Sequence, residues 1–301
     1  MAVTRRLNSG SLACLFTAVT FLLSWTFLFL AADWLKGWGA FVLMWIPAAV
    51  AIGFRIMFRE GFGDAGFHAG RPRYWLLAVA VPLALATATY FVAWLLKQVE
   101  ITPYLKQQSM FGPVPVRLTW FNADAGTLAL LGQRFLVVMT LGLVMGMLSG
   151  PGEEIGWRGY LLPRLIKAKV RYPILVSGLI WGTWHMPFVL LTFEHERYVT
   201  AALYFLLCVV FAVFISWIRL ASNSVFVAGM AHGAYNTFYQ DFYDHSFAGP
   251  HKWFWAGEVG LLCSIMFGAL ALWLFKTNRI APLLQQIRVD STPAISASAV
   301  A

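Results

Sequence analysis

The stretch GPGEEIGWRGY, residues Gly150–Tyr160, follows an apolar run, Phe135–Leu148, that has the character of a membrane span. It places two adjacent carboxylates, Glu153 and Glu154, and the guanidinium of Arg158 in otherwise hydrophobic surroundings. Ionisable groups within a membrane span are costly and usually face a polar interior. The stretch therefore indicates either a solvated helix end beneath the membrane or a buried polar site.

The composition favours the membrane. Of the 301 residues, 60% are apolar and only 12% are charged, whereas a soluble domain has about a quarter of its residues charged. So much apolar surface needs a lipid solvent. The net charge of +9 does not indicate nucleic-acid binding, because the basic residues fall between hydrophobic runs and form no continuous basic face.

Eight hydrophobic runs are long enough to cross a bilayer. They are residues 11–32, 40–58, 75–96, 131–150, 173–193, 201–218, 223–240 and 256–275. The sequence therefore predicts an all-α, polytopic membrane helix bundle of about eight transmembrane helices. We expect a single transmembrane domain over 1–275, with a motif-bearing core at about 131–240, and a short cytoplasmic tail over 276–301.

The distribution of lysine and arginine predicts the orientation, since cytoplasmic loops carry an excess of both. If the N-terminus is cytoplasmic, the cytoplasmic segments contain Arg5, Arg6, Arg55, Arg59, Arg71, Arg73, Arg164, Lys167, Lys169, Arg171, Arg219, Lys276, Arg279 and Arg288. The opposite loops contain Lys36, Lys97, Lys106, Arg117, Arg197 and Lys252. This bias of 14 to 6 predicts that both termini are cytoplasmic in a multi-pass protein of the plasma or inner membrane.

Three polar sets lie within these runs. In the first, Glu154 and Arg158 are at i, i+4 on a helix and can pair, while Glu153 is rotated by about 100° and is left for proton chemistry. The second is His185, which shares a helix face with Trp181; the alternative is a histidine satisfied by packing. The third is His232 with Asn236, again at i, i+4; the alternative is an interhelical hydrogen-bonding pair.

The three sets have a common depth. At about 1.5 Å per residue, His185 is about 18 Å and His232 about 15 Å from the cytoplasmic ends of their spans. If the fourth span continues to Pro163, Glu153 is also about 15 Å from its cytoplasmic end. One buried site is therefore predicted. Because that span would be long, Gly150-Pro151-Gly152 is expected to break it and to admit water to a protein-lined cavity.

Two hydrolytic routes fit these side chains. Glu153, His185 and His232 form a donor set that Zn²⁺ accepts, with a second glutamate as base. Without a metal, Glu153 and His185 would activate water, while His232 and Asn236 would stabilise the oxyanion of an amide undergoing attack. The cofactor is therefore either Zn²⁺ or none tightly bound.

The three motifs together resemble the CPBP family of CAAX prenyl endopeptidases and bacteriocin-processing (Abi-like) intramembrane proteases. That family carries EExxxR, FxxxH and HxxxN or HxxxD on successive transmembrane helices. Here they read Glu153–Arg158, Trp181–His185 and His232–Asn236, with a tryptophan where the family often has phenylalanine.

The resemblance implies an intramembrane endopeptidase with a conical buried site that opens toward the cytoplasm. It implies Glu153 as general base helped by His185, and His232 and Asn236 as oxyanion stabilisers. Glu154, Arg158 and Trp181 would support the site. The partners would be membrane lipid and a membrane-associated or prenylated protein or peptide. Both a metalloprotease and a glutamate-dependent mechanism are described for this family, and the sequence does not choose between them.

Other functions stay open at this stage. A non-catalytic immunity or scaffold protein of the same fold is one, and a proton-coupled transporter is another, since intramembrane Glu and His also suit a proton relay. The outer loops hold a second acidic and histidine-bearing set, which is either a metal or substrate patch or a solvated loop. It consists of Glu194, His195, Glu196, Asp241, Asp244, His245 and His251.

Overall fold

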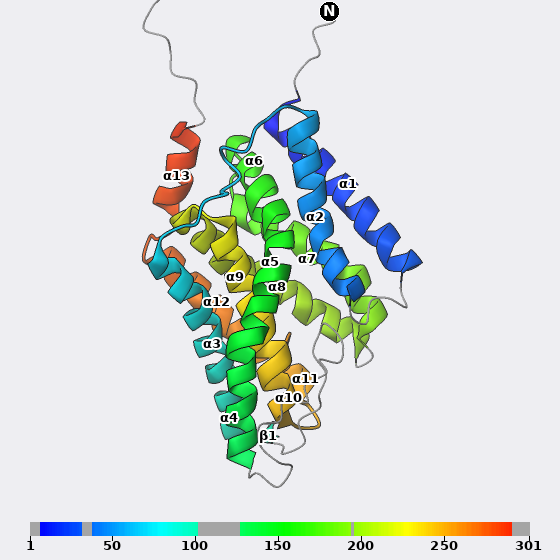
Figure 1. Cartoon of the computed structure of the whole chain (residues 1–301), viewed down its shortest axis with the longest axis vertical. Helices are drawn as coiled ribbons and strands as arrows, with labels where there is room; N and C mark the ends of the chain where they lie inside the picture. Colours follow the sequence, from blue (N-terminus) through cyan, green and yellow to red (C-terminus); the bar gives the residue numbers. More distant parts are fainter. Residues whose placement is uncertain (1–6, 32–37, 102–126, 194–195, 291–301) are drawn as a thin grey trace, which may run out of the picture.

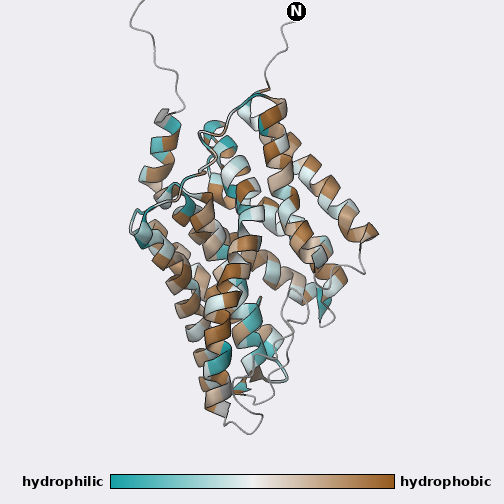
Figure 2. Ribbon diagram, viewed as in Figure 1, coloured by the Kyte–Doolittle hydropathy of each residue, from teal (hydrophilic) through white to brown (hydrophobic). Residues whose placement is uncertain are grey.

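The computed structural model describes residues 7–31, 38–101, 127–193 and 196–290. They form a helical bundle in which the first helix begins at the same end at which the last helix lies (Figure 1). Apolar residues run along the lengths of the helices, and hydrophilic residues gather near their ends (Figure 2). The predicted class, an all-α polytopic membrane bundle, is confirmed.

Most of the structure is helical. The longer helices are α1 (Ser9–Leu30), α2 (Trp38–Met57), α3 (Pro72–Leu95), α4 (Thr127–Val137), α5 (Leu143–Gly156), α7 (Pro173–Thr192), α8 (Arg197–Ser222), α9 (Val225–Asn236), α12 (Leu261–Lys276) and α13 (Ala281–Asp290). The shorter ones are α6 (Leu162–Lys167), α10 (Asp244–Ser246) and α11 (Lys252–Trp255). Three π-helical turns are η2 (Val138–Gly142), η3 (Trp157–Leu161) and η4 (Thr237–Tyr243). Two short strands, β1 (Glu100–Ile101) and β2 (Phe247–Ala248), pair antiparallel.

The number of spans is smaller than the eight predicted. Within the described ranges, six helices are long and apolar enough to cross a membrane, or seven if the bent pair of α12 and α13 counts as one span. The predicted run 223–240 is not among them: α9 continues into η4 as far as Tyr243, but the polar residues His232, Asn236 and Gln240 make this helix less apolar than the others. The last run yields only the 16 residues of α12.

The fourth span does not break at Gly150-Pro151-Gly152, contrary to the sequence-based expectation. A single 37-residue helical span runs over Leu131–Lys167, and α5 continues through Pro151. The irregularities lie instead in η2 and η3, on either side of α5. The glycines therefore have another role.

Glycines at these positions let three backbones approach one another. A Cβ on Gly150 would lie 2.1 Å from the carbonyl oxygen of Gly229, and one on Gly146 would lie 2.8 Å from that of Gly233. Small residues at a four-residue spacing on both helices thus bring α5 against α9, as at other membrane helix crossings. On another side of α5, a Cβ on Gly152 would lie 2.6 Å from the carbonyl oxygen of Met44 in α2. This packing carries Glu153 and Glu154 into the centre of the bundle.

An ion network closes the end of the bundle where the termini lie. Asp64, in the segment between α2 and α3, accepts hydrogen bonds from Arg55 at 2.7 Å and from Lys167 at 2.6 Å. The backbone carbonyl of Asp64 accepts from Arg219 of α8, and Arg55 also donates to the Gly159 carbonyl. Four elements are thus tied together at this end.

The predicted C-terminal tail contains a short helix. Its first part forms α13, which packs against α6 and α8. Ile280, Leu284 and Ile287 supply the apolar side chains at this contact. Residues 291–301, the rest of the tail, lie outside the described residues.

Candidate active site

Glu153 lies at the centre of the bundle and is only 2% exposed. Its Oε2 atom accepts a hydrogen bond of 2.6 Å from the indole Nε1–H of Trp181 on α7. The helices α5 and α7 therefore present the first and second motifs to each other. The indole also covers Arg158, whose Cζ atom lies 4.4 Å from the ring centroid.

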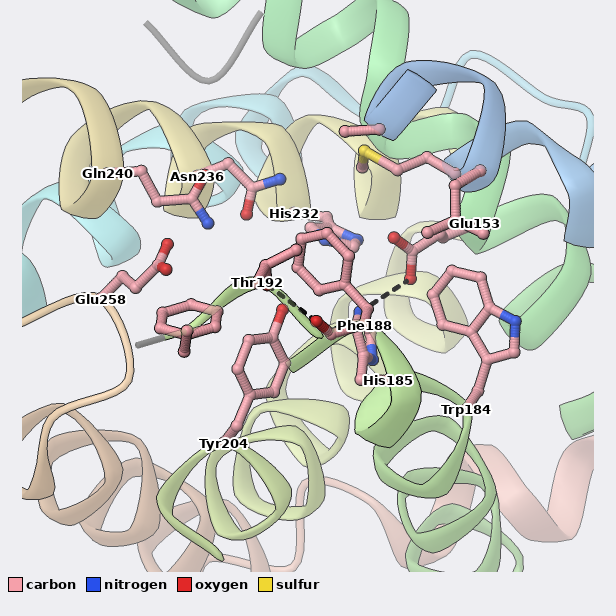
Figure 3. Close-up of a pocket in the computed structure, with 14 residues that line it drawn as sticks. Glu153, Trp184, His185, Phe188, Thr192, Tyr204, His232, Asn236, Gln240 and Glu258 are labelled. Atoms are coloured by element: carbon pink, nitrogen blue, oxygen red, sulfur yellow. Dashed lines mark hydrogen bonds and ion pairs between the residues drawn. The ribbon is translucent and has the colours of Figure 1, made fainter. Parts of the chain in front are cut away.

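His185 lies one helical turn after Trp181 and faces the same carboxylate (Figure 3). Its Nε2 atom is 4.0 Å from Glu153 Oε2, too far for a direct hydrogen bond. Its Nδ1 atom lies 3.1 Å from the Trp181 carbonyl oxygen, which can only accept, so Nδ1 carries the proton. When the imidazole is neutral, Nε2 consequently presents its lone pair to Glu153.

Glu154 pairs with Arg158, as the i, i+4 spacing predicts: the Arg158 Nη1 to Glu154 Oε1 distance is 3.1 Å, and both side chains are fully buried. The same oxygen lies 2.8 Å from Nδ1 of His232 on α9. Because a carboxylate oxygen accepts, the His232 Nδ1–H donates to it. Glu154 thus links the first motif to the third, which the sequence did not predict.

Asn236 follows His232 by one turn, and both line the same pocket. The pocket has a volume of about 240 Å³, enough for several water molecules. Glu153 and His185 lie at one end of it, and Asn236 and Gln240 lie along α9 and η4 (Figure 3). All of the sequence-predicted catalytic side chains therefore contribute to one cavity.

The pocket opens at the end of the bundle opposite the termini. Exposure increases from the buried Glu153 to Phe188 and then to Thr192, the last residue of α7. The lining from α2 comes from its first half, and that from α8 from its second turn at Tyr204. The cytoplasmic termini that the Lys/Arg bias predicts and the cytoplasm-facing site that the family resemblance implies are therefore incompatible in this fold.

The pocket residues that the sequence did not predict include Tyr204, Gln240 and Glu258. The His185 and Tyr204 ring centroids are 4.9 Å apart. Gln240 lies four residues after Asn236, and this continuation of the His232, Asn236 spacing is a signal that could have identified it. Glu258 lies between α11 and α12, and no local pattern marks it.

The acidic and histidine-bearing loop set does not form one cluster in the described residues. Asp244 pairs with Lys252 at 3.0 Å, and His245 Nδ1 lies 2.7 Å from the Gln240 carbonyl oxygen. Glu194 and His195 lie outside the described residues. In the part of the chain that the structure describes, no group of three His, Cys, Asp or Glu side chains is arranged to hold a metal ion.

The same test applies to the predicted Zn²⁺ ligands Glu153, His185 and His232, and their arrangement does not fit one. The Glu153 oxygen nearest His185 is occupied by the Trp181 N–H, and Nδ1 of His232 is engaged by Glu154. Within the residues that the structure describes, these three side chains therefore do not form a metal-binding group.

Comparison with protein families agrees with the geometry. Residues 133–238 match the family described as "Type II CAAX prenyl endopeptidase Rce1-like", and this segment contains all three motifs. A search of curated proteins finds no match to the chain. In its motif-bearing core the chain is therefore similar to the type II CAAX prenyl endopeptidases, and the family resemblance that the motifs indicate is confirmed.

Proposed function

We propose that the protein is an intramembrane endopeptidase in which Glu153 and His185 activate water without a metal ion. The observation that carries the proposal is the facing pair of Glu153 Oε2 and His185 Nε2, 4.0 Å apart at the buried end of a polar pocket. The family match supports protease chemistry in general. The assignment of roles to single residues is the proposal.

The separation of these two acceptors suits a bridging water. A water oxygen about 2.8 Å from each atom would see them at an angle of about 90°, within the ordinary range for two hydrogen bonds from one water. Both atoms are acceptors, since Glu153 is a carboxylate and the His185 proton is on Nδ1. Each hydrogen of the water is thus directed to a base.

The reaction then follows general acid–base chemistry. Glu153 takes one proton as the water oxygen attacks the carbonyl carbon of the scissile amide. The C–N bond of the tetrahedral intermediate breaks as this proton passes to the leaving nitrogen. The products are a carboxylic acid and an amine, so atoms and charge balance. His185 orients the water through its second hydrogen.

His232 and Asn236 supply hydrogen bonds to the tetrahedral oxyanion. Because the His232 Nδ1–H already donates to Glu154, its contribution requires a second proton on Nε2, which makes it an imidazolium. The Glu154 carboxylate lies at hydrogen-bonding distance and stabilises that charge. Glu154 therefore acts through His232 as a positioning group, and Arg158 holds Glu154 in place.

The substrate class is a peptide or protein associated with the membrane. The cavity is buried within apolar helices, so a scissile bond has to enter it from the membrane boundary. A prenylated substrate is one member of this class.

Turnover of membrane-associated peptides in detergent tests the proposal. We expect wild-type protein to cleave and to show one new carboxyl terminus, whereas Glu153→Gln and His185→Ala lose cleavage while remaining folded. Cys263→Ala is a matched control, because Cys263 is also buried but contacts Tyr235, and neither of these residues lines the pocket. Unchanged cleavage by Glu153→Gln would contradict the proposed role of Glu153. Full biological activity of Glu153→Gln in cells, with no cleavage by the wild type, would instead favour a scaffold role.

A further inference from the structure

We propose that the pocket opens on the non-cytoplasmic face of the membrane, and that its substrates are peptide segments on that side. This inference rests on the proposed peptidase function and deepens it. It combines the direction of the pocket with the distribution of basic residues, two observations that are independent of each other.

The direction of the pocket follows from the ends of the helices that line it. We call the end of the bundle at which α1 begins the terminal end. Helix α7 starts there, beside α6, and reaches the opposite end at Thr192; α9 reaches that opposite end through η4. Thr192 is exposed, while Phe193, Tyr204, Gln240 and Glu258 are half-buried. Because exposure among lining residues increases only in this direction, the mouth lies here.

The opposite route from Glu153, toward the termini, is filled. Trp157, Tyr160 and Leu161 follow Glu153 along the span, and each is 0% exposed. The Trp157 ring packs against Phe16 and Trp184, with centroids 5.8 and 5.6 Å apart. Beyond them lies the ion network of Arg55, Asp64 and Lys167. A peptide cannot pass through this packing without unfolding it.

Basic residues assign the two ends of the bundle to sides of the membrane. Among the described residues, the terminal end carries four in 55–73, four in 164–171, three in 276–288 and Arg219. The mouth end carries Lys97, Arg134, Arg197 and Lys252. Lysine and arginine accumulate on the cytoplasmic side whether or not acidic residues accompany them. The terminal end is therefore cytoplasmic, and the mouth faces away from the cytoplasm.

The consequence concerns the substrate. A prenylated C-terminus carried on the cytoplasmic leaflet would meet the closed end of the bundle. A secreted peptide, or a membrane-protein segment just outside the bilayer, would meet the open end. The substrate class inferred is therefore an extracytoplasmic peptide segment.

Side-specific labelling of the full chain tests this. In a Cys14→Ala background, the remaining cysteines Cys208 and Cys263 are buried and protected from bulky reagents. Thr192→Cys places a thiol at the mouth, and Lys276→Cys places one at the exposed terminal end. Spheroplasts are treated with a polyethylene-glycol maleimide that does not cross membranes, before and after permeabilisation.

We expect Thr192→Cys to be labelled equally in intact and permeabilised spheroplasts, and Lys276→Cys to be labelled only after permeabilisation. The reverse pattern would overturn the inference. Because labelling does not need catalysis, it reports on the side of the mouth even if no peptide is cleaved. Reversed labelling with Glu153-dependent cleavage intact would refute the access side alone, whereas loss of the Glu153 dependence would refute the proposed function alone.

Discussion

The indole Nε1–H of Trp181 donates a 2.6 Å hydrogen bond to Oε2 of Glu153, the carboxylate that faces His185. A phenylalanine, which the resembling family often has at this position, lacks this donor. The tryptophan therefore changes the site in more than ring size, because it fixes one oxygen of the general base. Trp181 is 2% exposed, so this hydrogen bond is shielded from bulk water.

Trp181→Phe is expected to lower kcat about 10- to 150-fold with little change in KM, because a lost hydrogen bond to a charged group costs about 1.5–3 kcal/mol and affects the base rather than substrate binding. Steady-state kinetics in detergent measures this. Trp184→Phe is the matched control: Trp184 is also 2% exposed, but its Nε1 has no hydrogen-bond partner. Equal losses in both variants would show that ring volume, not the indole N–H, matters.

Glu154→Gln is expected to destabilise the fold by about 3–5 kcal/mol, because it leaves the buried Arg158 charge without its partner. Thermal unfolding in detergent measures the loss. The double variant Glu154→Gln/Arg158→Met removes both charges and should regain most of the stability, but not activity, since His232 still lacks its carboxylate. If the double variant were less stable than the single one, the ion pair would not be the cause.

Gly233→Ala is expected to separate α5 from α9 and to cost about 1–3 kcal/mol or more, because its Cβ would lie 2.2 Å from the Gly146 carbonyl oxygen. The yield and melting temperature of the purified protein report this. Gly53→Ala in α2 is the control, since its Cβ would meet nothing within 4 Å and alanine favours a helix. Tolerance of alanine at Gly233 would contradict the close helix crossing.

Asp64 should make stability sensitive to acid. Burial alone would raise the pKa of this carboxyl, but Lys167 and Arg55 outweigh it and lower the pKa from 3.8 to about 2. A lowered folded-state pKa contributes stability above the unfolded pKa, and this contribution, about 2 kcal/mol, is lost as the pH falls from 4 toward 2. The stability difference between wild type and Asp64→Asn, measured by denaturant unfolding, should shrink over that interval. A constant difference would mean that Asp64 does not titrate there.

Local spacing in the sequence predicted what depends on a single helix, and little that depends on helix crossings. The Glu154–Arg158 pair follows from i, i+4 geometry, and the common depth of Glu153, His185 and His232 follows from the helical rise. The contact between Glu154 and His232 spans two helices and depends on how closely α5 and α9 approach. No single-helix pattern contains that information.

The expected break at Gly150-Pro151-Gly152 was wrong for a related reason. Glycine and proline end helices in water, but in a packed membrane bundle a neighbouring helix can use the space that a glycine leaves. Gly150 is needed for the approach of Gly229, a fact that only the packed structure reveals. The eight predicted spans became six or seven for two reasons: α12 is shorter than its apolar run, and the helix over 225–243 carries the polar residues of the site.

The most direct test of the account is activity after complete removal of metals. Purified wild-type protein is treated with a strong chelator, its metal content is measured by elemental analysis, and peptide cleavage is compared with that of Glu153→Gln. We predict that metal-free wild type cleaves at its original rate, whereas Glu153→Gln does not cleave with or without added zinc. Loss of wild-type activity together with stoichiometric zinc, and its return when zinc is restored, would contradict the central claim that Glu153 and His185 act directly on water.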